Sequence, residues 1–374
     1  TGELRYYETR EWSSNIELLT GGAVLDFRVF PWEYDGTTWK QQTAFPVASN
    51  SYGFIGDMIV TDIDGDSKME TIVGISGGTV QILEYEDGVM IPAHTFVFPD
   101  TSSFQSIAVG DLDNDGNPHL EILVSATNFV AQSAIYKFID DGYHQVFNIS
   151  SADSRPVGGA ACAIGDVNND GDLEFVVTEE YPDEDGLCLL RLFDYNGNTW
   201  TELDSYSFTV SRNLNWIFQT QIIDADNDGQ NEIYVNPEKE PIQLLELQEG
   251  QLVCTWMADM QSSTSQRSSF VGDFTNDGLL DIVLADHSMD LFYVFETVDG
   301  AIVNTFNVSV PDLQYSWYNG MEIGDIDADG RNELVYVSLG DEYLRIFRNR
   351  ELIHCLPLGY EGSYVVTIGN YDND

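Results

Sequence analysis

Short runs of β-branched and aromatic residues follow one another along the whole chain, separated by turns rich in glycine and aspartate. In the first complete set, the runs 53–61, 69–76 and 79–86 are followed by a fourth run that contains residues 93–99. Turns such as Asp87-Gly88 and Asp299-Gly300, each preceding a fourth run, are strong hairpin signals. No segment longer than about ten residues shows a helical period, so we predict an all-β chain.

A short acidic loop lies between the first and second runs of each set. Six such loops begin at Asp62, Asp111, Asp166, Asp224, Asp273 and Asp325, and a seventh, NYDND, begins at Asn370, where the sequence stops. A repeat of roughly 50 residues built from four short strands is typical of a β-propeller. We therefore predict a single domain over residues 1–374, a seven-bladed β-propeller with four-stranded antiparallel blades that start near residues 51, 102, 157, 214, 266 and 316.

The two ends of the chain carry complementary parts of one further blade. Residues 363–369 predict a first strand that runs into the NYDND loop, residues 3–12 predict a second strand, and residues 23–45 predict the outer hairpin. We expect the closing blade to combine residues 363–374 with residues 1–46. Pairing the ends in this way removes the open sheet edges that promote aggregation.

The acidic loops have the spacing of a calcium site. Ca²⁺ takes about six to eight oxygen ligands, and alternate aspartates in a tight loop direct their side chains at one ion. Glycine at position six permits the positive φ that this turn needs, position seven offers its carbonyl, and position nine adds a last carboxylate. We predict about six Ca²⁺ sites and a seventh split between the termini. The predicted ligands are Asp62, Asp64, Asp66, Lys68 and Glu70; Asp111, Asp113, Asp115, Asn117 and Glu121; Asp166, Asn168, Asp170, Asp172 and Glu174; Asp224, Asp226, Asp228, Gln230 and Glu232; Asp273, Thr275, Asp277, Leu279 and Asp281; Asp325, Asp327, Asp329, Arg331 and Glu333; and Asn370, Asp372 and Asp374.

Three loops depart from this pattern. Ser67 stands where glycine is usual, and Thr275 replaces a carboxylate, so we predict the weakest of the six intact sites at Asp273. His119 occupies position nine of its loop, so either Glu121 reaches the site over a bulge or water completes it. The competing interpretation is a set of plain Asx-Gly hairpin turns, which favour the same residues. Six copies, each with an acid at or near position nine, favour metal binding.

The composition excludes several classes of function. With 63 acidic and 15 basic residues the net charge is −48, which argues against nucleic acid or an anionic membrane as a partner. The chain has no apolar run long enough to span a bilayer, so we expect no membrane insertion. The four cysteines show no CxxC spacing, and we predict buried free thiols. Because the chain begins at Thr1 without Met or a signal peptide, we expect a processed or excised chain.

No catalytic motif stands out, and we predict that the chain is not an enzyme. Aromatic and basic residues gather instead in loops on the face opposite the acidic loops, where they could bind a sugar or an acidic partner. They could equally close the mouth of the propeller. These residues are Arg155, Arg212, Trp216, Arg267, Tyr315 and Trp317. Two N-glycosylation sequons, at Asn148 and Asn307, should be accessible at the ends of outer strands.

Several of the loops follow an apolar strand that ends in Gly-Asp, at residues 110–111, 165–166, 272–273 and 324–325. In this respect the chain resembles the FG-GAP/VCBS-type repeats, which form calcium-binding β-propellers in integrin α-subunits and in many secreted proteins. The resemblance implies an extracellular, calcium-stabilised module for adhesion, recognition or structural assembly, with a protein or glycan partner or with self-assembly. The alternative is a secreted lectin or polysaccharide-active enzyme that uses the opposite face, in which case Trp216 and Trp317 should be essential.

Overall fold

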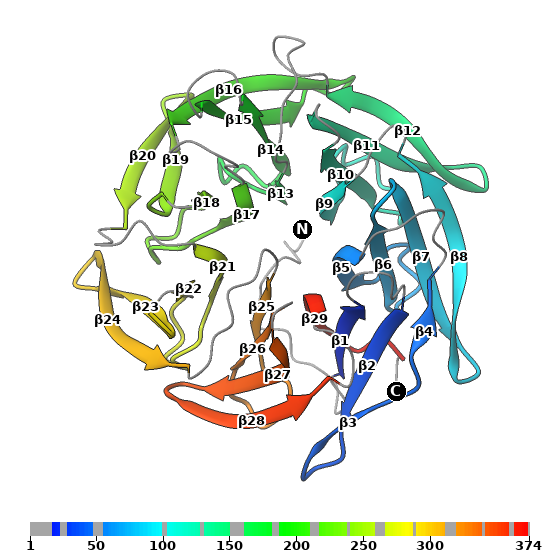
Figure 1. Ribbon diagram of the computed structural model, residues 1–374. Coiled ribbons are helices and arrows are strands. Elements are labelled where there is room, and N and C mark those ends of the chain that lie inside the picture. The colour runs from blue at the N-terminus through cyan, green and yellow to red at the C-terminus, as the bar shows by residue number, and fades with distance from the viewer. Residues whose placement is uncertain are drawn as a thin grey trace. The chain divides into compact units, whose positions relative to one another are not determined.

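The computed structural model in Figure 1 describes residues 17–22, 28–47, 55–98, 103–127, 131–149, 161–181, 187–209, 217–237, 240–258, 266–286, 289–310, 319–338, 341–358 and 363–372. Every secondary-structure element assigned in these residues is a β-strand, and the strands form seven antiparallel sheets. The fold is a seven-bladed β-propeller, as predicted. We name the blades A to G.

Six of the blades are meanders of four consecutive strands. Blade B contains β5 (Ile55–Thr61), β6 (Glu70–Ile75), β7 (Thr79–Glu86) and β8 (Val89–Val97); blade C contains β9 (Ser103–Gly110), β10 (Glu121–Thr127), β11 (Ala131–Ile139) and β12 (Gly142–Ile149); blade D contains β13 (Cys162–Gly165), β14 (Glu174–Tyr181), β15 (Leu187–Tyr195) and β16 (Trp200–Thr209). Blade E contains β17 (Ile217–Ile223), β18 (Glu232–Pro237), β19 (Gln243–Gln248) and β20 (Gln251–Met257); blade F contains β21 (Gln266–Gly272), β22 (Asp281–Asp286), β23 (Leu291–Val298) and β24 (Ala301–Ser309); blade G contains β25 (Asn319–Gly324), β26 (Glu333–Ser338), β27 (Asp341–Arg348) and β28 (Glu351–Pro357).

Blade A is assembled from both ends of the chain. Its strand order is β29 (Ser363–Gly369), β1 (Glu17–Gly22), β2 (Arg28–Tyr34) and β3 (Trp39–Gln41), and β4 (Phe45–Pro46) also pairs with β2. The C-terminal strand and the outer hairpin were predicted correctly. The second strand was not: β1 takes the place that we predicted for residues 3–12, which lie outside the described residues. Glu17 pairs with Gly369 just as Glu174 pairs with Gly165, so the register of the other blades is kept.

The contacts divide the chain into two compact units, which we describe separately. The first contains blades D and E and most of blade C, and its core lies between neighbouring sheets, with Val176, Leu190 and Ile233 fully buried. The second contains blades A, B and G and most of blade F, with cores around Val73, Val283 and others. Second strands such as β6, β18 and β22 are buried along their whole length, whereas the outer strands β8, β12 and β24 are partly exposed. These second strands are therefore buried on both faces.

The glycine before several acidic loops has a packing role. A Cβ atom added at Gly165 would lie 2.6 Å from Ile222 of the next blade, and one added at Gly369 would lie 2.5 Å from Val60. Such distances are far below ordinary van der Waals contact between carbon atoms. The lack of a side chain at this glycine therefore lets the start of the loop lie against the next blade.

Candidate metal centres

Each loop is shaped by hydrogen bonds to its first and last carboxylates. In blade E, Asp224 accepts from the backbone N–H groups of Asp228 (2.9 Å) and Gly229 (3.0 Å), and Glu232 accepts from that of Ala225 (2.8 Å). Bonds from the second loop residue to the last carboxylate recur in four further intact loops, and in the intact loop of blade F the third residue donates instead. The acceptors are Glu70, Glu121, Glu174, Glu333 and Asp281.

The last carboxylate of every loop is almost completely buried. Glu174, Glu232 and Glu333 are 0% exposed, and the corresponding residues of the other intact loops, Glu70, Glu121 and Asp281, are at most 3% exposed. Burying a carboxylate is costly unless a positive charge or hydrogen-bond donors compensate for the lost water. These positions therefore demand a compensating partner.

Two residues of each of the six intact loops adopt the left-handed backbone conformation. Position six is glycine in five loops, for example Gly229 at φ 94°, and position four is a residue such as Asn227 at φ 62°. Ser67 holds position six in blade B at φ 74°, so the loop closes although a Cβ is present. The positive φ predicted for position six is confirmed.

Acidic oxygens converge in four of the loops. In each of them, three carboxylates offer one oxygen each, and these oxygens lie within 4.8 Å of one another. The groups are Asp62, Asp64 and Asp66; Asp111, Asp113 and Glu121; Asp224, Asp226 and Glu232; and Asp325, Asp327 and Glu333. In blade D, Asn168 replaces one carboxylate and its amide donates to Glu174 Oε1 (3.1 Å).

Blade E shows that the geometry fits a cation. Oε1 of Glu232 is buried and has no hydrogen-bond partner, although the side chain sits against Asp224 and Asp226. Burial and the nearby charge of Asp226 raise the pKa of Glu232 to about 8. Burial likewise raises the pKa values of Glu70 and Glu174 to about 8. A hard divalent cation, which prefers carboxylate oxygens, would satisfy the unpartnered atom and the charge together.

At position seven, the backbone N–H donates to the carboxylate two residues before it. The backbone N–H of Lys68 donates to Asp66 (2.8 Å), and that of Gln230 donates to Asp228 (2.9 Å). Leu279 donates to Asp277 in the same way, and its side chain is exposed. Asn117 and Asp172 repeat the bond to the carboxylate two residues before them. The N–H at position seven is therefore used within the loop, and in blade B the ammonium group of Lys68 also pairs with Asp66 (3.5 Å).

The irregular loop of blade C resolves the alternatives left by its sequence. Glu121 reaches the loop and accepts from the N–H of Leu112 (2.9 Å), as the last carboxylates of other loops do. His119 turns away and stacks on Phe138, with 3.9 Å between the ring centroids. The two inserted residues are therefore accommodated without loss of the last carboxylate.

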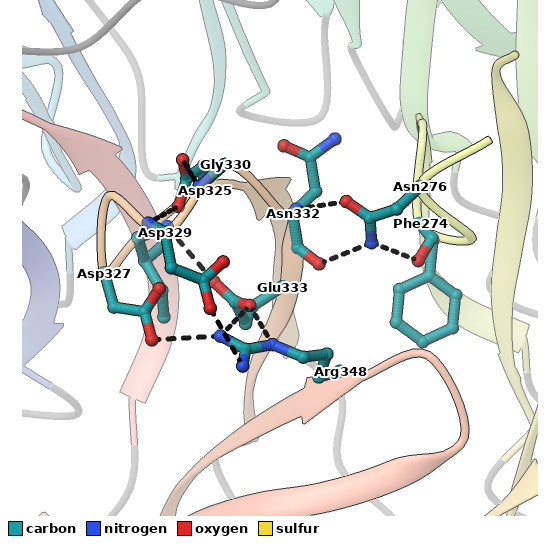
Figure 2. Close-up of polar contacts among 10 residues, drawn as sticks. Phe274, Asn276, Asp325, Asp327, Asp329, Gly330, Asn332, Glu333 and Arg348 are labelled. Atoms are coloured by element: carbon teal, nitrogen blue, oxygen red, sulfur yellow. Dashed lines mark hydrogen bonds and ion pairs between the residues drawn. The ribbon is translucent and has the colours of Figure 1, made fainter. Parts of the chain in front are cut away.

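Two loops contain a basic side chain that we did not predict from the sequence. In blade C, Lys137 Nζ contacts Asp113, Asp115 (2.8 Å) and Glu121 (3.5 Å). In blade G, Arg348 contacts Asp327 (2.9 Å), Asp329 (3.1 Å) and Glu333 (2.6 Å), as Figure 2 shows. Both residues lie on the third strand of their blade, more than ten residues from the loop, so only the strand register reveals the contact.

The split loop of blade A also gains a residue that we did not predict. Glu17 is 2% exposed, and its Oε2 accepts from the N–H of Tyr371 (3.2 Å), which is the bond made by the last carboxylate elsewhere. Glu17 therefore completes the loop that begins at Asn370. Asp372 is described within this loop, whereas Asp374 lies outside the described residues.

Most of the predicted ligand face cannot be compared with the structure. Arg155, Arg212, Trp216, Tyr315 and Trp317 lie outside the described residues, and of Arg267 only the backbone position in β21 is described.

Both sequon asparagines are exposed on outer strands, Asn148 on β12 and Asn307 on β24, as predicted.

None of the four cysteines forms a disulfide. Cys162 and Cys188 are buried as predicted, but Cys254 is only partly buried and Cys355 is exposed, because both lie on outer strands, β20 and β28. In the described part of the chain, no helix is long and apolar enough to cross a membrane.

The fold and the site together define a class of protein, the seven-bladed β-propellers with an acidic loop between the first two strands of their blades. The chain belongs to the FG-GAP-like repeat family, which matches residues 62–124, 166–235 and 273–336. It is also 24% identical over 260 residues to cartilage acidic protein 1 of Xenopus tropicalis, covering 62% of this chain and 39% of that protein. The chain thus spans about two fifths of this relative.

Solved structures resemble the fold at low sequence identity. A protein of unknown function from Desulfotomaculum acetoxidans aligns with a TM-score of 0.62 and 12% identity, covering 96% of this chain and 100% of that one. A putative 6-phosphogluconolactonase from Bacteroides fragilis aligns with a TM-score of 0.60 and 11% identity, covering 96% and 99%. At such identities the likeness shows the fold alone.

Proposed function

We propose that this chain is an extracellular β-propeller stabilised by bound calcium, and that it serves as a recognition, adhesion or structural assembly module for a protein or glycan partner. Calcium would act on the fold rather than on a reaction. It would join the first strand, the loop and the second strand of a blade through shared carboxylates, and so fix the positions of the loops that a partner meets.

The observation that carries this proposal is the unpartnered, fully buried Oε1 of Glu232 within a group of three converging carboxylates. A plain hairpin turn gives no reason to bury a carboxylate oxygen without a donor. The same loop, with a buried last carboxylate, is repeated along the chain, so the demand for positive charge is a property of the fold.

Three features support an extracellular location. Loops of this kind suit the millimolar calcium found outside cells. The sequon residues Asn148 and Asn307 are exposed, as a glycan acceptor must be. A relative that covers 62% of the chain bears the name cartilage acidic protein 1, and this chain is itself strongly acidic, with a net charge of −48.

Thermal unfolding tests the role of calcium. The purified chain is melted in excess calcium, after EGTA treatment, and after EGTA treatment followed by excess magnesium. We expect a drop of many degrees on chelation that calcium reverses and an equal concentration of magnesium does not, because ligand binding to the native state alone raises its stability. An unchanged melting temperature would contradict the proposal.

The sequons give a separate test of the location. The chain is secreted from a eukaryotic cell line behind an added signal peptide, and its mobility is compared before and after enzymatic removal of N-glycans. Asn148→Gln and Asn307→Gln should each remove one glycan. Secretion without any glycan on either residue would remove this support.

A further inference from the structure

The residue across the sheet from each last carboxylate divides the blades into two groups. Strand pairs such as Thr71–Leu83, Ile122–Tyr136 and Leu334–Phe347 set the register between the second and third strands. One residue further along, the third strand places a side chain beside the last carboxylate of the loop. That residue is acidic in five blades, namely Glu33, Glu84, Asp194, Glu246 and Glu296, and basic in two, namely Lys137 and Arg348.

The two basic residues occupy equivalent places in their loops. Lys137 contacts the carboxylates at positions three and five and the last carboxylate of blade C, and Arg348 contacts the same three positions in blade G. Their side chains are only 15% and 25% exposed. The two loops therefore share one design, although a lysine provides the charge in one and an arginine in the other.

These contacts are made with the oxygens that would otherwise surround an ion. Figure 2 shows the guanidinium of Arg348 directed at Asp327, Asp329 and Glu333. A divalent cation in this loop would have to displace the guanidinium and would be repelled by it at short range. Replacing an acid by a base at this position changes the charge of the site as much as the arrival of one divalent cation does.

The five blades with an acidic residue at this place have the opposite charge beside the loop. Strand register places Glu246 opposite Glu232 and Glu296 opposite Asp281, so both acids lie near their loops. In blade E, where Glu246 stands, the unpartnered buried oxygen is Oε1 of the last carboxylate itself, Glu232, whereas in blades C and G it is Oδ1 of Asp113 and Asp327, whose Oδ2 atoms meet the basic side chain. A fifth acid thus increases the demand for an external cation.

We propose that Lys137 and Arg348 are built-in replacements for the metal ion. Blades C and G are closed by these side chains and take up no calcium, whereas the loops that face a third-strand acid, with blade E as the clearest case, bind the ion. This inference deepens the proposed function and rests on calcium binding by the chain as a whole.

The test counts calcium ions per chain by native mass spectrometry after equilibration with calcium. Lys137→Glu restores the residue type of the other blades and should gain one ion relative to the unmodified chain, and Arg348→Glu should likewise gain one. Glu246→Lys should lose one. Lys40→Glu is the matched control, because Lys40 is exposed, pairs with Asp35 in a turn of blade A and should leave the count unchanged.

Lys137→Gln and Arg348→Gln guard against variants that fail to fold, because they remove the positive charge without adding a negative one, and each should also gain one ion. An unchanged count in all four substitutions at Lys137 and Arg348, with calcium bound to the unmodified chain, would overturn this inference and leave the proposed function standing. No calcium on the unmodified chain at all would overturn the proposed function itself.

Discussion

The loops of blades E and G share one backbone and differ in where the positive charge comes from. Both hold the first aspartate by backbone N–H bonds and bury the last glutamate completely. In blade G, Glu333 meets the guanidinium of Arg348, whereas in blade E one oxygen of Glu232 meets no donor. The comparison teaches that the loop sequence sets the shape of the site, while one residue on the third strand of the blade sets whether a side chain or a metal ion supplies the positive charge.

Removing calcium should expose the cost of burying the last carboxylates most strongly through pH, in blade G as well as in blade E, because burial also raises the pKa of Glu333 to about 8. Burial raises the pKa values of Glu70, Glu174 and Glu232 to about 8, from an ordinary value of 4.5. Between these values the native state binds protons that the unfolded state has released, so the stability due to these groups is complete below pH 4.5 and is lost as pH rises through 8. In buffer freed of calcium by a chelating resin, the melting temperature should decrease as the pH is raised from about 5 to about 8.5.

Saturating calcium is the control for this pH series. Because the bound ion needs ionised carboxylates, protons compete with it, and the fall in melting temperature with rising pH should become small or reverse. A calcium-free profile that stays flat across the window would show that the buried glutamates are compensated within the chain.

Exchanging the charge source should change stability in opposite directions in the two blades. Without calcium, Arg348→Gln leaves Asp327, Asp329 and Glu333 without their cation and should cost about 3 kcal/mol, as expected when one partner of a buried ion pair is removed. Glu246→Gln removes a repelling charge from blade E and should raise the calcium-free melting temperature. Urea unfolding of both variants measures the two effects, and a loss of equal size in both would contradict the comparison.

The close contact before the loops should be independent of the cation. Gly165→Ala places a Cβ 2.6 Å from Ile222, so it should destabilise the chain by about 1–3 kcal/mol, as overpacked cores do. The loss should be the same with calcium and with EGTA in chemical unfolding. A loss seen only with calcium would mean that the glycine acts through the loop and not through packing.

The smallest effect is expected at the one loop that lacks glycine at position six. Ser67→Gly relieves a left-handed backbone at φ 74° and should stabilise blade B by at most about 1 kcal/mol, because the greater freedom of glycine in the unfolded chain offsets part of the gain. The melting temperature should rise slightly. A decrease would indicate that the serine side chain takes part in the loop.

The fold followed from the sequence because each blade repeats the same order of apolar runs and turns. The third strand at residues 79–86 and the last strand at residues 363–369 were predicted with the bounds that the structure has. The second strand of blade A was missed because residues 3–12 have an equally good strand pattern and because nothing in a linear sequence joins Asn370 to Glu17.

The candidate site was predictable only as far as its ligands are neighbours in sequence. Alternate aspartates and a following acid identify a loop directly, which is why Glu121 could be considered in spite of its shifted position. Lys137 and Arg348 act from a third strand, and their contact depends on register. Counting back from the hairpin turns to the residue opposite each last carboxylate would have shown a basic residue where other blades have Glu or Asp.

The most direct test of this account is a crystal of the chain grown in calcium and measured at a long X-ray wavelength, where calcium scatters anomalously. Anomalous peaks should appear in the loops that begin at Asp62, Asp166, Asp224 and Asp273 and in the split loop at Asn370, with Lys137 and Arg348 still paired to the loops at Asp111 and Asp325. Peaks in these last two loops, with both basic side chains displaced, would contradict the proposal that Lys137 and Arg348 take the place of the metal ion. The lack of any peak would contradict the role of calcium in the fold.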